Sequence, residues 1–315
     1  MHAPPLPIES PLDAIGNTPV VRLRHVVPKG HANVYLKLES LNPTGSYKDR
    51  MAKPLVEEAE RRGDLKPGMT VVEATGGSTG SSLAFVCAAK GYKFRAASSN
   101  AFAVEKLRTM QAFGATVDII QSPSGEVTKD LMPAMVQHAK NIAEKGNCYP
   151  TEQFNNRDAF VGYEAMANEL IHQFPNGIDA FCSTVGSAGM AMGVARVLKP
   201  KWPQIRVVIC EPAGSPVLTE GRAGTHHVDG VGIGYVPPLL DRELYDEERA
   251  ISEKEGRGMC RRLAKEEALL VGTSTGLNVT AAIALAKELG PGKTVVTVAC
   301  DTGLKYLNGD LFATE

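Results

Sequence analysis

The sequence has little net charge of either sign. Its 315 residues include 34 Lys and Arg against 35 Asp and Glu, so the formal net charge is -1. Proteins that bind nucleic acid or anionic lipid carry an excess of basic residues on one surface. The charge balance gives no support to either kind of partner, and we expect neither nucleic acid nor a membrane to bind.

Long apolar runs and closely spaced cysteines are also missing. The most apolar stretches are far shorter than the roughly 20 residues that span a bilayer. Residues 1–7 have neither the basic start nor the apolar centre of a signal peptide. The six cysteines include no C-x2-C pair of the kind that binds zinc. We therefore expect no metal site, buried reduced thiols and a cytoplasmic protein.

What the sequence does have is an alternation of strand-like and helix-like segments. Apolar residues make up 43% and charged residues 22% of a chain that is long for a single core. The alternation is typical of parallel sheets covered by helices on both faces, so the predicted fold class is α/β. We expect strands at 34–38, 70–73, 93–97, 116–120, 180–184, 207–210, 269–271 and 294–300. We expect helices at 47–62, 78–90, 102–113 and 126–145.

One lysine stands at the start of a predicted helix. Residues 41–46 contain turn-forming Asn-Pro and Thr-Gly pairs, and Ser46 is of a helix-capping type. Lys48 then falls in the first turn, where unpaired N–H groups make a further positive charge unfavourable. A lysine that gives up its proton easily suits an amine that forms a Schiff base. The alternative is a solvated surface lysine, which is the commoner case.

Three loops rich in glycine or hydroxyl groups follow predicted strands. The loop at 73–80 suits a carboxylate, although a simple glycine-rich turn is equally consistent with it. The loop at 183–190 suits one phosphate held by backbone amides, and it matches neither G-x-G-x-x-G nor a Walker motif. In the loop at 271–276, a hydroxyl can either bond a heteroaromatic nitrogen or cap the next helix.

Together, the lysine and the three loops indicate pyridoxal 5'-phosphate (PLP) as the cofactor. The aldehyde of PLP needs a lysine, its phosphate needs an anion site, and an amino-acid substrate needs a carboxylate site. A dinucleotide has no support, because its fingerprint is missing.

Several blocks of sequence resemble one enzyme family, in the same order over nearly the whole chain. The blocks are 15–19 (IGNTP), 46–50 (SYKDR), 153–154 (QF), 211–218 (EPAGSPVL), 230–234 (GVGIG) and 301–306 (DTGLKY). The chain resembles the cysteine synthase (O-acetylserine sulfhydrylase) and cystathionine β-synthase family, which are fold-type-II PLP enzymes.

The resemblance implies a fold and a domain organisation. The expected fold is like that of the tryptophan synthase β subunit, with two domains, each built on a mostly parallel twisted sheet covered by helices. The smaller, mobile domain would span 41–155. The larger domain, 1–40 plus 156–315, would carry the phosphate loop. The resemblance also suggests a homodimer.

The resemblance further implies roles for individual residues. Lys48 would be the catalytic residue that holds PLP and moves the α-proton, and Ser274 would face the pyridine nitrogen. The implied cofactor-binding residues are Lys48, Ser78, Gly186, Ser187, Ala188, Gly189, Met190 and Ser274. The implied substrate-binding residues are Thr75, Gly76, Ser78, Thr79, Gln153 and Gly230.

The implied reaction is β-replacement on a serine-derived amino acid through an aminoacrylate, with sulfide or a thiol as the nucleophile. A neutral hydroxyl at the pyridine nitrogen favours β-elimination, because it does not keep that nitrogen protonated. One alternative is β-elimination alone, as in a dehydratase, deaminase or cysteine lyase. Another is a catalytically silent relative that acts as a binding protein.

The sequence departs from the family pattern at the carboxylate loop. The family's Thr-Ser-Gly-Asn-Thr is Thr-Gly-Gly-Ser-Thr at 75–79. Gly76 therefore lacks a hydroxyl and is expected to leave extra space, while Ser78 is shorter than the usual asparagine. Met190 also replaces a threonine of the phosphate loop. Our hypothesis is that O-acetylserine is not the best donor.

Overall fold

The computed structural model describes residues 7–125, 128 and 130–313. Its strands are β1 (Val20–Arg22), β2 (Asn33–Lys37), β3 (Thr70–Ala74), β4 (Lys93–Ser99), β5 (Thr116–Ile120), β6 (Cys148–Pro150), β7 (Ala180–Thr184), β8 (Arg206–Pro212), β9 (Glu247–Ile251) and β10 (Thr294–Val298). They form a six-stranded sheet of order β1-β2-β10-β7-β8-β9 and a four-stranded sheet of order β5-β4-β3-β6. All the pairings between these strands are parallel except that of β1 with β2.

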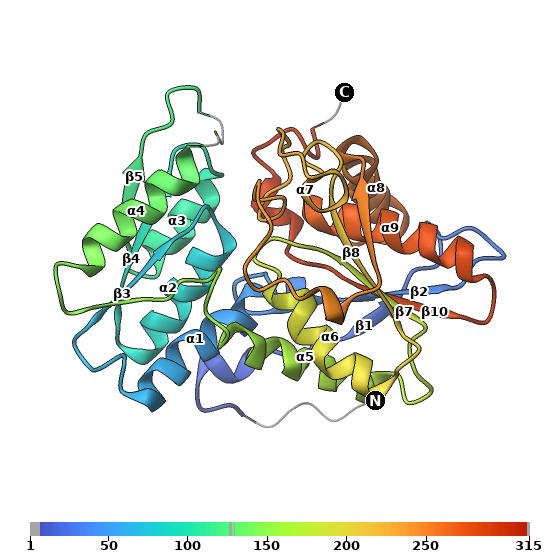
Figure 1. Cartoon of the computed structure of the whole chain (residues 1–315), viewed down its shortest axis with the longest axis horizontal. Helices are drawn as coiled ribbons and strands as arrows, with labels where there is room; N and C mark the ends of the chain where they lie inside the picture. The colour runs from blue at the N-terminus through green and yellow to red at the C-terminus, as the bar shows by residue number, and fades with distance from the viewer. Residues whose placement is uncertain (1–6, 126–127, 129, 314–315) are drawn as a thin grey trace.

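The helices cover both faces of each sheet, and the two layered units lie side by side (Figure 1). The helices are α1 (Lys48–Arg62), α2 (Ser78–Lys90), α3 (Val104–Ala112), α4 (Leu131–Ala143), α5 (Ala159–Gln173), α6 (Gly189–Lys201), α7 (Val217–Glu220), α8 (Glu253–Glu266) and α9 (Thr273–Leu289). Short 3-10 helices occur at η1 (Pro11–Ala14), η2 (Glu39–Leu41), η3 (Arg242–Leu244) and η4 (Gly303–Tyr306). The predicted α/β class is confirmed.

Neighbouring residues of a central strand enter different cores, because side chains alternate across a strand. In β3, Val71 packs in the core under α2 and α3, whereas Val72 packs in the core under α4. In β10, Val295 faces the core under α8 and α9, and Val296 faces the core under α5 and α6. Strands buried on both faces read as continuous apolar runs, and this is the pattern that the sequence shows.

Helix α1 joins the two layered units. Its Met51 and Leu55 pack with α5 and α6 against the larger sheet. Its Ala52 and Val56 pack with α2 against the smaller sheet. A spacing of four residues places the two members of each pair on one side of the helix. The domain limits at 41–155 and 1–40 plus 156–315 stay a prediction.

One predicted strand is missing from the structure, and several other predicted elements begin or end at different residues. Residues 269–271 form no strand; Val271 makes only an isolated bridge to Thr302, and the segment joins neither sheet. The last predicted strand ends at Val298 rather than at 300. The helix predicted at 126–145 is α4, which begins at Leu131, and positions 126, 127 and 129 of that prediction lie outside the described residues.

None of the helices in the described ranges combines the length and the apolar character that a membrane crossing requires. Within the same ranges, no group of three His, Cys, Asp or Glu side chains is placed to hold a metal ion. All six cysteines are free; five are buried and Cys148 is half-buried.

Candidate active site

Two of the three predicted loops, 73–80 and 183–190, lie where parallel strands end, whereas the loop at 271–276 follows no strand. Helix α1 is docked onto the end of a third strand. The loop at 75–77 follows β3, the loop at 185–188 follows β7, and residues 299–301 follow β10. Ser46 forms an isolated bridge with Asp301, and the Tyr47 N–H donates to the Cys300 carbonyl at 3.0 Å. The start of α1 therefore lies beside the end of β10. Ligands of open α/β sheets bind at such strand ends.

Lys48 is the first residue of α1, as predicted, and its side chain is only 8% exposed. The capping residue is Tyr47 rather than Ser46, whose hydroxyl instead accepts the Lys48 N–H at 3.2 Å. Within the described part of the chain, the Lys48 amine has no hydrogen bond or ion pair; its close contact is the Tyr47 ring, with 4.8 Å to the ring centre. Burial lowers the pKa of Lys48 to about 8, against the opposing effects of Cys300 and Glu73.

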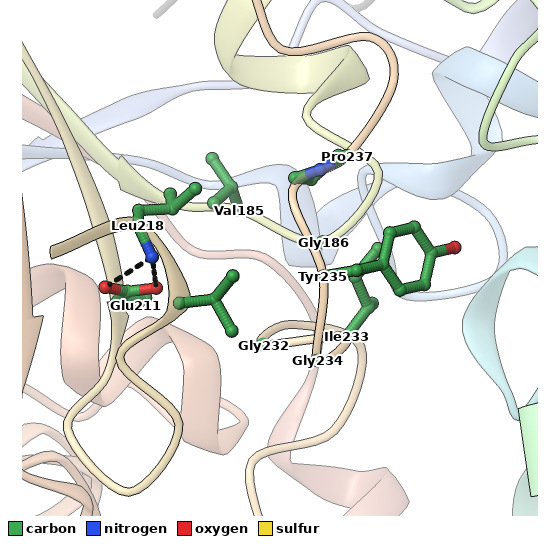
Figure 2. A pocket seen from close by; sticks show the side chains of 10 residues that line it. Val185, Gly186, Glu211, Leu218, Gly232, Ile233, Gly234, Tyr235 and Pro237 are labelled. Carbon is green, nitrogen blue, oxygen red and sulfur yellow. Dashed lines mark hydrogen bonds between the residues drawn. The ribbon is translucent and has the colours of Figure 1, made fainter. Parts of the chain in front are cut away.

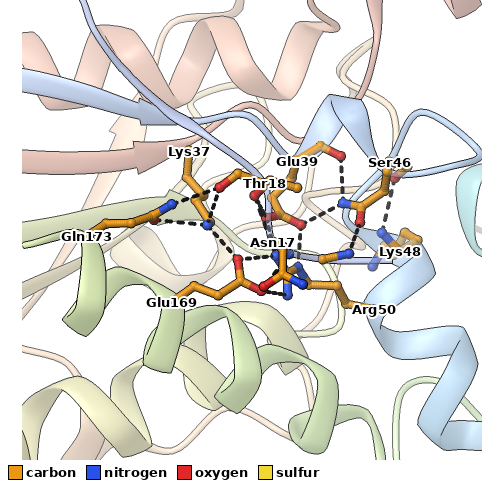
Figure 3. Close-up of polar contacts among 11 residues, drawn as sticks. Asn17, Thr18, Lys37, Glu39, Ser46, Lys48, Arg50, Glu169 and Gln173 are labelled. Carbon is orange, nitrogen blue, oxygen red and sulfur yellow. Dashed lines mark hydrogen bonds and ion pairs between the residues drawn. The ribbon is translucent and has the colours of Figure 1, made fainter. Parts of the chain in front are cut away.

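A buried ionic network fixes the first turn of α1 (Figure 3). The Arg50 guanidinium bonds Glu39 at 2.6 Å and Glu169 at 2.7 Å. The Lys37 ammonium bonds the same Glu169 at 2.6 Å. Burial opposes ionisation of Glu169, but the bonds from Arg50 and Lys37 prevail and lower its pKa to about 2. The network ties α1 to β2 and α5, and it thereby sets the position of Lys48.

The predicted carboxylate loop is closed by its own hydroxyl groups. The Thr75 hydroxyl accepts the N–H groups of Gly77 and Gly80, at 3.2 and 3.1 Å. The Thr79 hydroxyl donates to the Gln153 side-chain oxygen at 2.8 Å. Three of the residues predicted to bind the substrate, Thr75, Thr79 and Gln153, are therefore brought together. The loop leads into the N-terminus of α2, where free N–H groups favour an anion.

The extra space expected at Gly76 is absent, and that interpretation was wrong. A Cβ added to Gly76 would lie 2.3 Å from the Cε1 atom of Phe102, which fills this region from the turn before α3. The missing hydroxyl is therefore replaced by an aromatic side chain and not by a cavity.

The predicted phosphate loop turns sharply into α6. Ala188 has a left-handed backbone, with φ of 65°, and precedes the helix at Gly189. A Cβ added to Gly186 would lie 2.1 Å from the carbonyl oxygen of Gly230, so the two predicted site residues are in contact. The Met190 side chain packs in the core, so any contact of residue 190 with a phosphate would be through its backbone.

Buried hydroxyl groups and a small pocket surround this loop. The hydroxyls of Ser183, Thr184 and Thr273 are buried without a hydrogen-bond partner in the described residues. A pocket beside the loop is lined by Val185, Gly186, Glu211, Val217, Leu218, Gly232, Ile233, Gly234, Tyr235 and Pro237 (Figure 2). Orphaned hydroxyls of this kind suit a polar ligand, because leaving them unpaired costs free energy.

Ser274 lies in the first turn of α9, but it does not cap this helix. The cap is Gly272, without a side-chain bond, so the capping alternative for Ser274 does not apply. The Ser274 hydroxyl instead lies close enough to the Cys300 thiol to lower its pKa, although burial prevails and raises this pKa to about 12. Cys300 also interacts with the Lys48 amine. Lys48 and Ser274, which the sequence separates by more than two hundred residues, thus share a neighbour.

Several residues at the site escaped the sequence analysis. The Glu73 carboxylate accepts bonds from the Thr151 hydroxyl and the Gln153 N–H, and burial raises its pKa to about 7. Lys106 and Lys305 are buried beside the carboxylate loop. Glu73 lies in the predicted carboxylate loop at 73–80, and Lys305 lies in the matched block 301–306. These two segments were the sequence signal from which both residues could have been identified. Lys106 has no local signal.

The arrangement fits PLP: a buried unpaired lysine, an anion site at a helix start, and orphaned hydroxyls between them. The sequence model described as "Pyridoxal-phosphate dependent enzyme" matches residues 11–301. The chain belongs to this family. Members of the family use PLP, which supplies an electron sink for bonds at the α-carbon of an amino acid. The predicted cofactor is thereby confirmed.

Individual relatives cover almost the whole length of this family member. A cysteine synthase of Staphylococcus aureus is 42% identical over 309 residues, which is 98% of each chain. An O-ureido-L-serine synthase of Streptomyces lavendulae is 37% identical over 304 residues, or 96% of this chain and 91% of that one. The solved O-acetyl serine sulfhydrylase isoform 3 of Entamoeba histolytica is 32% identical, has a TM-score of 0.93, and is matched over 100% of this chain and 95% of that one. The predicted resemblance is confirmed.

Proposed function

We propose that the protein is a cysteine synthase-type enzyme, which replaces the β-substituent of a serine-derived amino acid with sulfide. The observation that carries the proposal is the buried, unpaired Lys48 amine beside the predicted carboxylate loop. The chain-wide similarity to cysteine synthases supports the choice of sulfide as the nucleophile.

The positions of the residues support the roles that the family resemblance implies for them. Lys48, with a pKa near 8, is neutral often enough at physiological pH to take the α-proton and to return it. The loop 75–79, with Gln153, holds the substrate carboxylate beside this amine. The loop 186–190 holds the phosphate, against the backbone of Gly230. Ser274 bonds the pyridine nitrogen and leaves it unprotonated.

Three further proposals rest on the family resemblance. The protein forms a homodimer, it is cytoplasmic, and 41–155 is the smaller, mobile domain. The free, mostly buried cysteines support a reducing compartment. Sedimentation of the purified protein tests the dimer, because a monomer at micromolar concentration contradicts it.

A donor panel tests the proposed reaction. The holoenzyme is given O-acetylserine, O-phosphoserine, serine or cysteine, each with and without sulfide or a thiol, and the products are identified by mass. We expect a new amino acid whose formation depends on the nucleophile. Release of a keto acid and ammonia at the same rate with or without sulfide would contradict the proposal. The same panel tests the hypothesis that O-acetylserine is not the best donor.

A further inference from the structure

Two buried lysines that the proposed function does not use lie against the carboxylate loop. Lys305, in η4, is 9% exposed, and Lys106, in α3, is 3% exposed. The Lys305 Nζ atom is 3.4 Å from the Ser78 hydroxyl. The Lys106 Nζ atom would lie 3.5 Å from a Cβ added to Gly77. Both ammonium groups therefore face the turn at which α2 begins.

The two lysines differ in how their charges are balanced. The Lys106 ammonium forms an ion pair with Asp229 and lies 4.8 Å from the centre of the Tyr306 ring. In the described ranges, the Lys305 ammonium makes one hydrogen bond, to Ser78, and no ion pair. An ammonium has three donors, so two donors of Lys305 remain unused.

The surroundings of Lys305 make its charge costly unless an anion joins it. Burial lowers the pKa of Lys305, with Lys106 acting in the same direction and Asp301 and Asp49 in the opposite one. Neither carboxylate forms an ion pair with Lys305 in the described residues: both oxygens of Asp49 accept from Thr44, and Asp301 accepts from the Tyr306 hydroxyl through Oδ2 while its buried Oδ1 has no hydrogen-bond partner. The N-terminus of α2 adds further positive potential.

The loop beside Lys305 has fewer polar side chains than the family pattern. The family pattern has a serine and an asparagine where this chain has Gly76 and Ser78. Phe102 fills the region of the first missing side chain and offers no donor. The unused donors of Lys305 lie beside Ser78, the position at which the family pattern has the asparagine.

We propose that Lys305 binds the α-carboxylate of the amino-acid substrate, adding a charged donor to the loop 75–79, where Gly76 has no hydroxyl. The inference rests on the proposed function, because it needs an amino acid at this loop. Lys106, held by Asp229, shapes the same wall without reaching the carboxylate.

Paired ligands test the assignment on the holoenzyme. The dissociation constants of L-serine and L-serinamide are measured from the change in PLP absorption, since only the first ligand carries a carboxylate. Lys305→Met should weaken L-serine binding roughly 10- to 100-fold, the usual loss for a bond between charged groups. It should change L-serinamide binding by less than about threefold. Lys66→Met, on an exposed lysine, is the control and should change neither.

Two further variants guard against a folding defect. Lys305→Arg keeps the charge and should retain most of the affinity for L-serine. Lys305→Gln keeps a donor without the charge, and it replaces the Met variant if that protein fails to bind PLP. Equal weakening of both ligands, or unchanged L-serine binding, overturns the proposal. Failure of the proposed function is seen separately, as a wild-type enzyme that makes no sulfide-dependent product.

Discussion

The Phe102 ring occupies the space into which a side chain at residue 76 would project. A Cβ on Gly76 would lie within 2.3 to 2.6 Å of three ring atoms, closer than real Cβ contacts come. Residue 76 is therefore restricted to glycine for as long as Phe102 keeps its place. The two positions belong to different elements, so the change from serine in the family pattern to glycine is coupled to a distant aromatic residue.

Gly76→Ser, which restores the family residue, should therefore impair this protein. Overpacking costs about 1–3 kcal/mol, which corresponds to a loss of roughly 10- to 100-fold in substrate binding if the loop shifts. The double variant Gly76→Ser with Phe102→Ala should recover most of that loss. L-serine binding to the holoenzyme is the measurement, with Phe102→Ala alone as the control. A harmless single Gly76→Ser would show that the ring moves freely.

Gly186 and Gly189 provide a matched pair in the phosphate loop. A Cβ on Gly186 would lie 2.1 Å from the Gly230 carbonyl oxygen, whereas the nearest atom to a Cβ on Gly189 would be 3.5 Å away. Gly186→Ala must displace backbone, and we expect PLP affinity to fall by at least about tenfold. Gly189→Ala should leave the affinity within about threefold. Titration of each apoprotein variant with PLP measures the affinities. Similar affinities for the two variants would contradict the assignment of 186–190 as the phosphate loop.

The fold was predicted best where local signals agree with one another. The helix at 78–90 has the predicted ends, because glycines stand at both of its boundaries, including Gly91 in the left-handed region. The apolar run at 269–271 was misread as a strand; it joins neither sheet, and Val271 makes only an isolated bridge to Thr302. Whether a short apolar run becomes a strand depends on its neighbours in space, which its own residues do not encode.

The site residues also differ in whether their own stretch of sequence indicates their role. Lys48 and the three loops carry local signals, namely a helix start and clusters of small residues at predicted strand ends. Phe102 carries no local signal, and for Lys305 the block 301–306 marks the segment but not the role of the lysine. The role of each residue follows from its contact with the loop 75–79. Sequence comparison with the family pattern showed that donors were missing from this loop. Only the three-dimensional packing shows that the Phe102 ring and the Lys305 ammonium lie beside these positions.

The pKa of Lys48 predicts how the apoprotein takes up PLP. Only the neutral amine attacks an aldehyde, and burial lowers the pKa of Lys48 from 10.5 to about 8. The rate of PLP uptake should rise by about tenfold per pH unit well below pH 7, by about fivefold between pH 7 and 8, and should then level off. A lysine with its ordinary pKa would give a rate that still rises at pH 10. Stopped-flow absorption of the lysine-bound cofactor measures the rate, and Lys48→Ala, which should fold but form no such band, is the control.

The Arg50–Glu169 pair should matter more for stability than a surface pair on the same helix. Glu169→Gln removes the carboxylate that Arg50 and Lys37 share, and we expect a loss of roughly 3 kcal/mol in the free energy of unfolding at pH 7. Glu164→Gln, also in α5, breaks only the exposed pair with Arg196 and should cost less than about 1 kcal/mol. Urea unfolding of the two variants makes the comparison.

The pH dependence of the stability lost in Glu169→Gln distinguishes the contribution of the Glu169 charge from that of its packing. The pKa of Glu169 is lowered from 4.5 to about 2 in the folded protein, so its stabilisation is fully present well above pH 4.5 and is lost as the pH falls toward 2. The gap in unfolding free energy between wild type and Glu169→Gln should therefore be constant from pH 7 to about 6 and should narrow below pH 4.5. A gap that stays the same down to pH 3.5 would assign the loss to packing. Because the network holds the first turn of α1, the same variant should also weaken PLP binding, whereas Glu164→Gln should not.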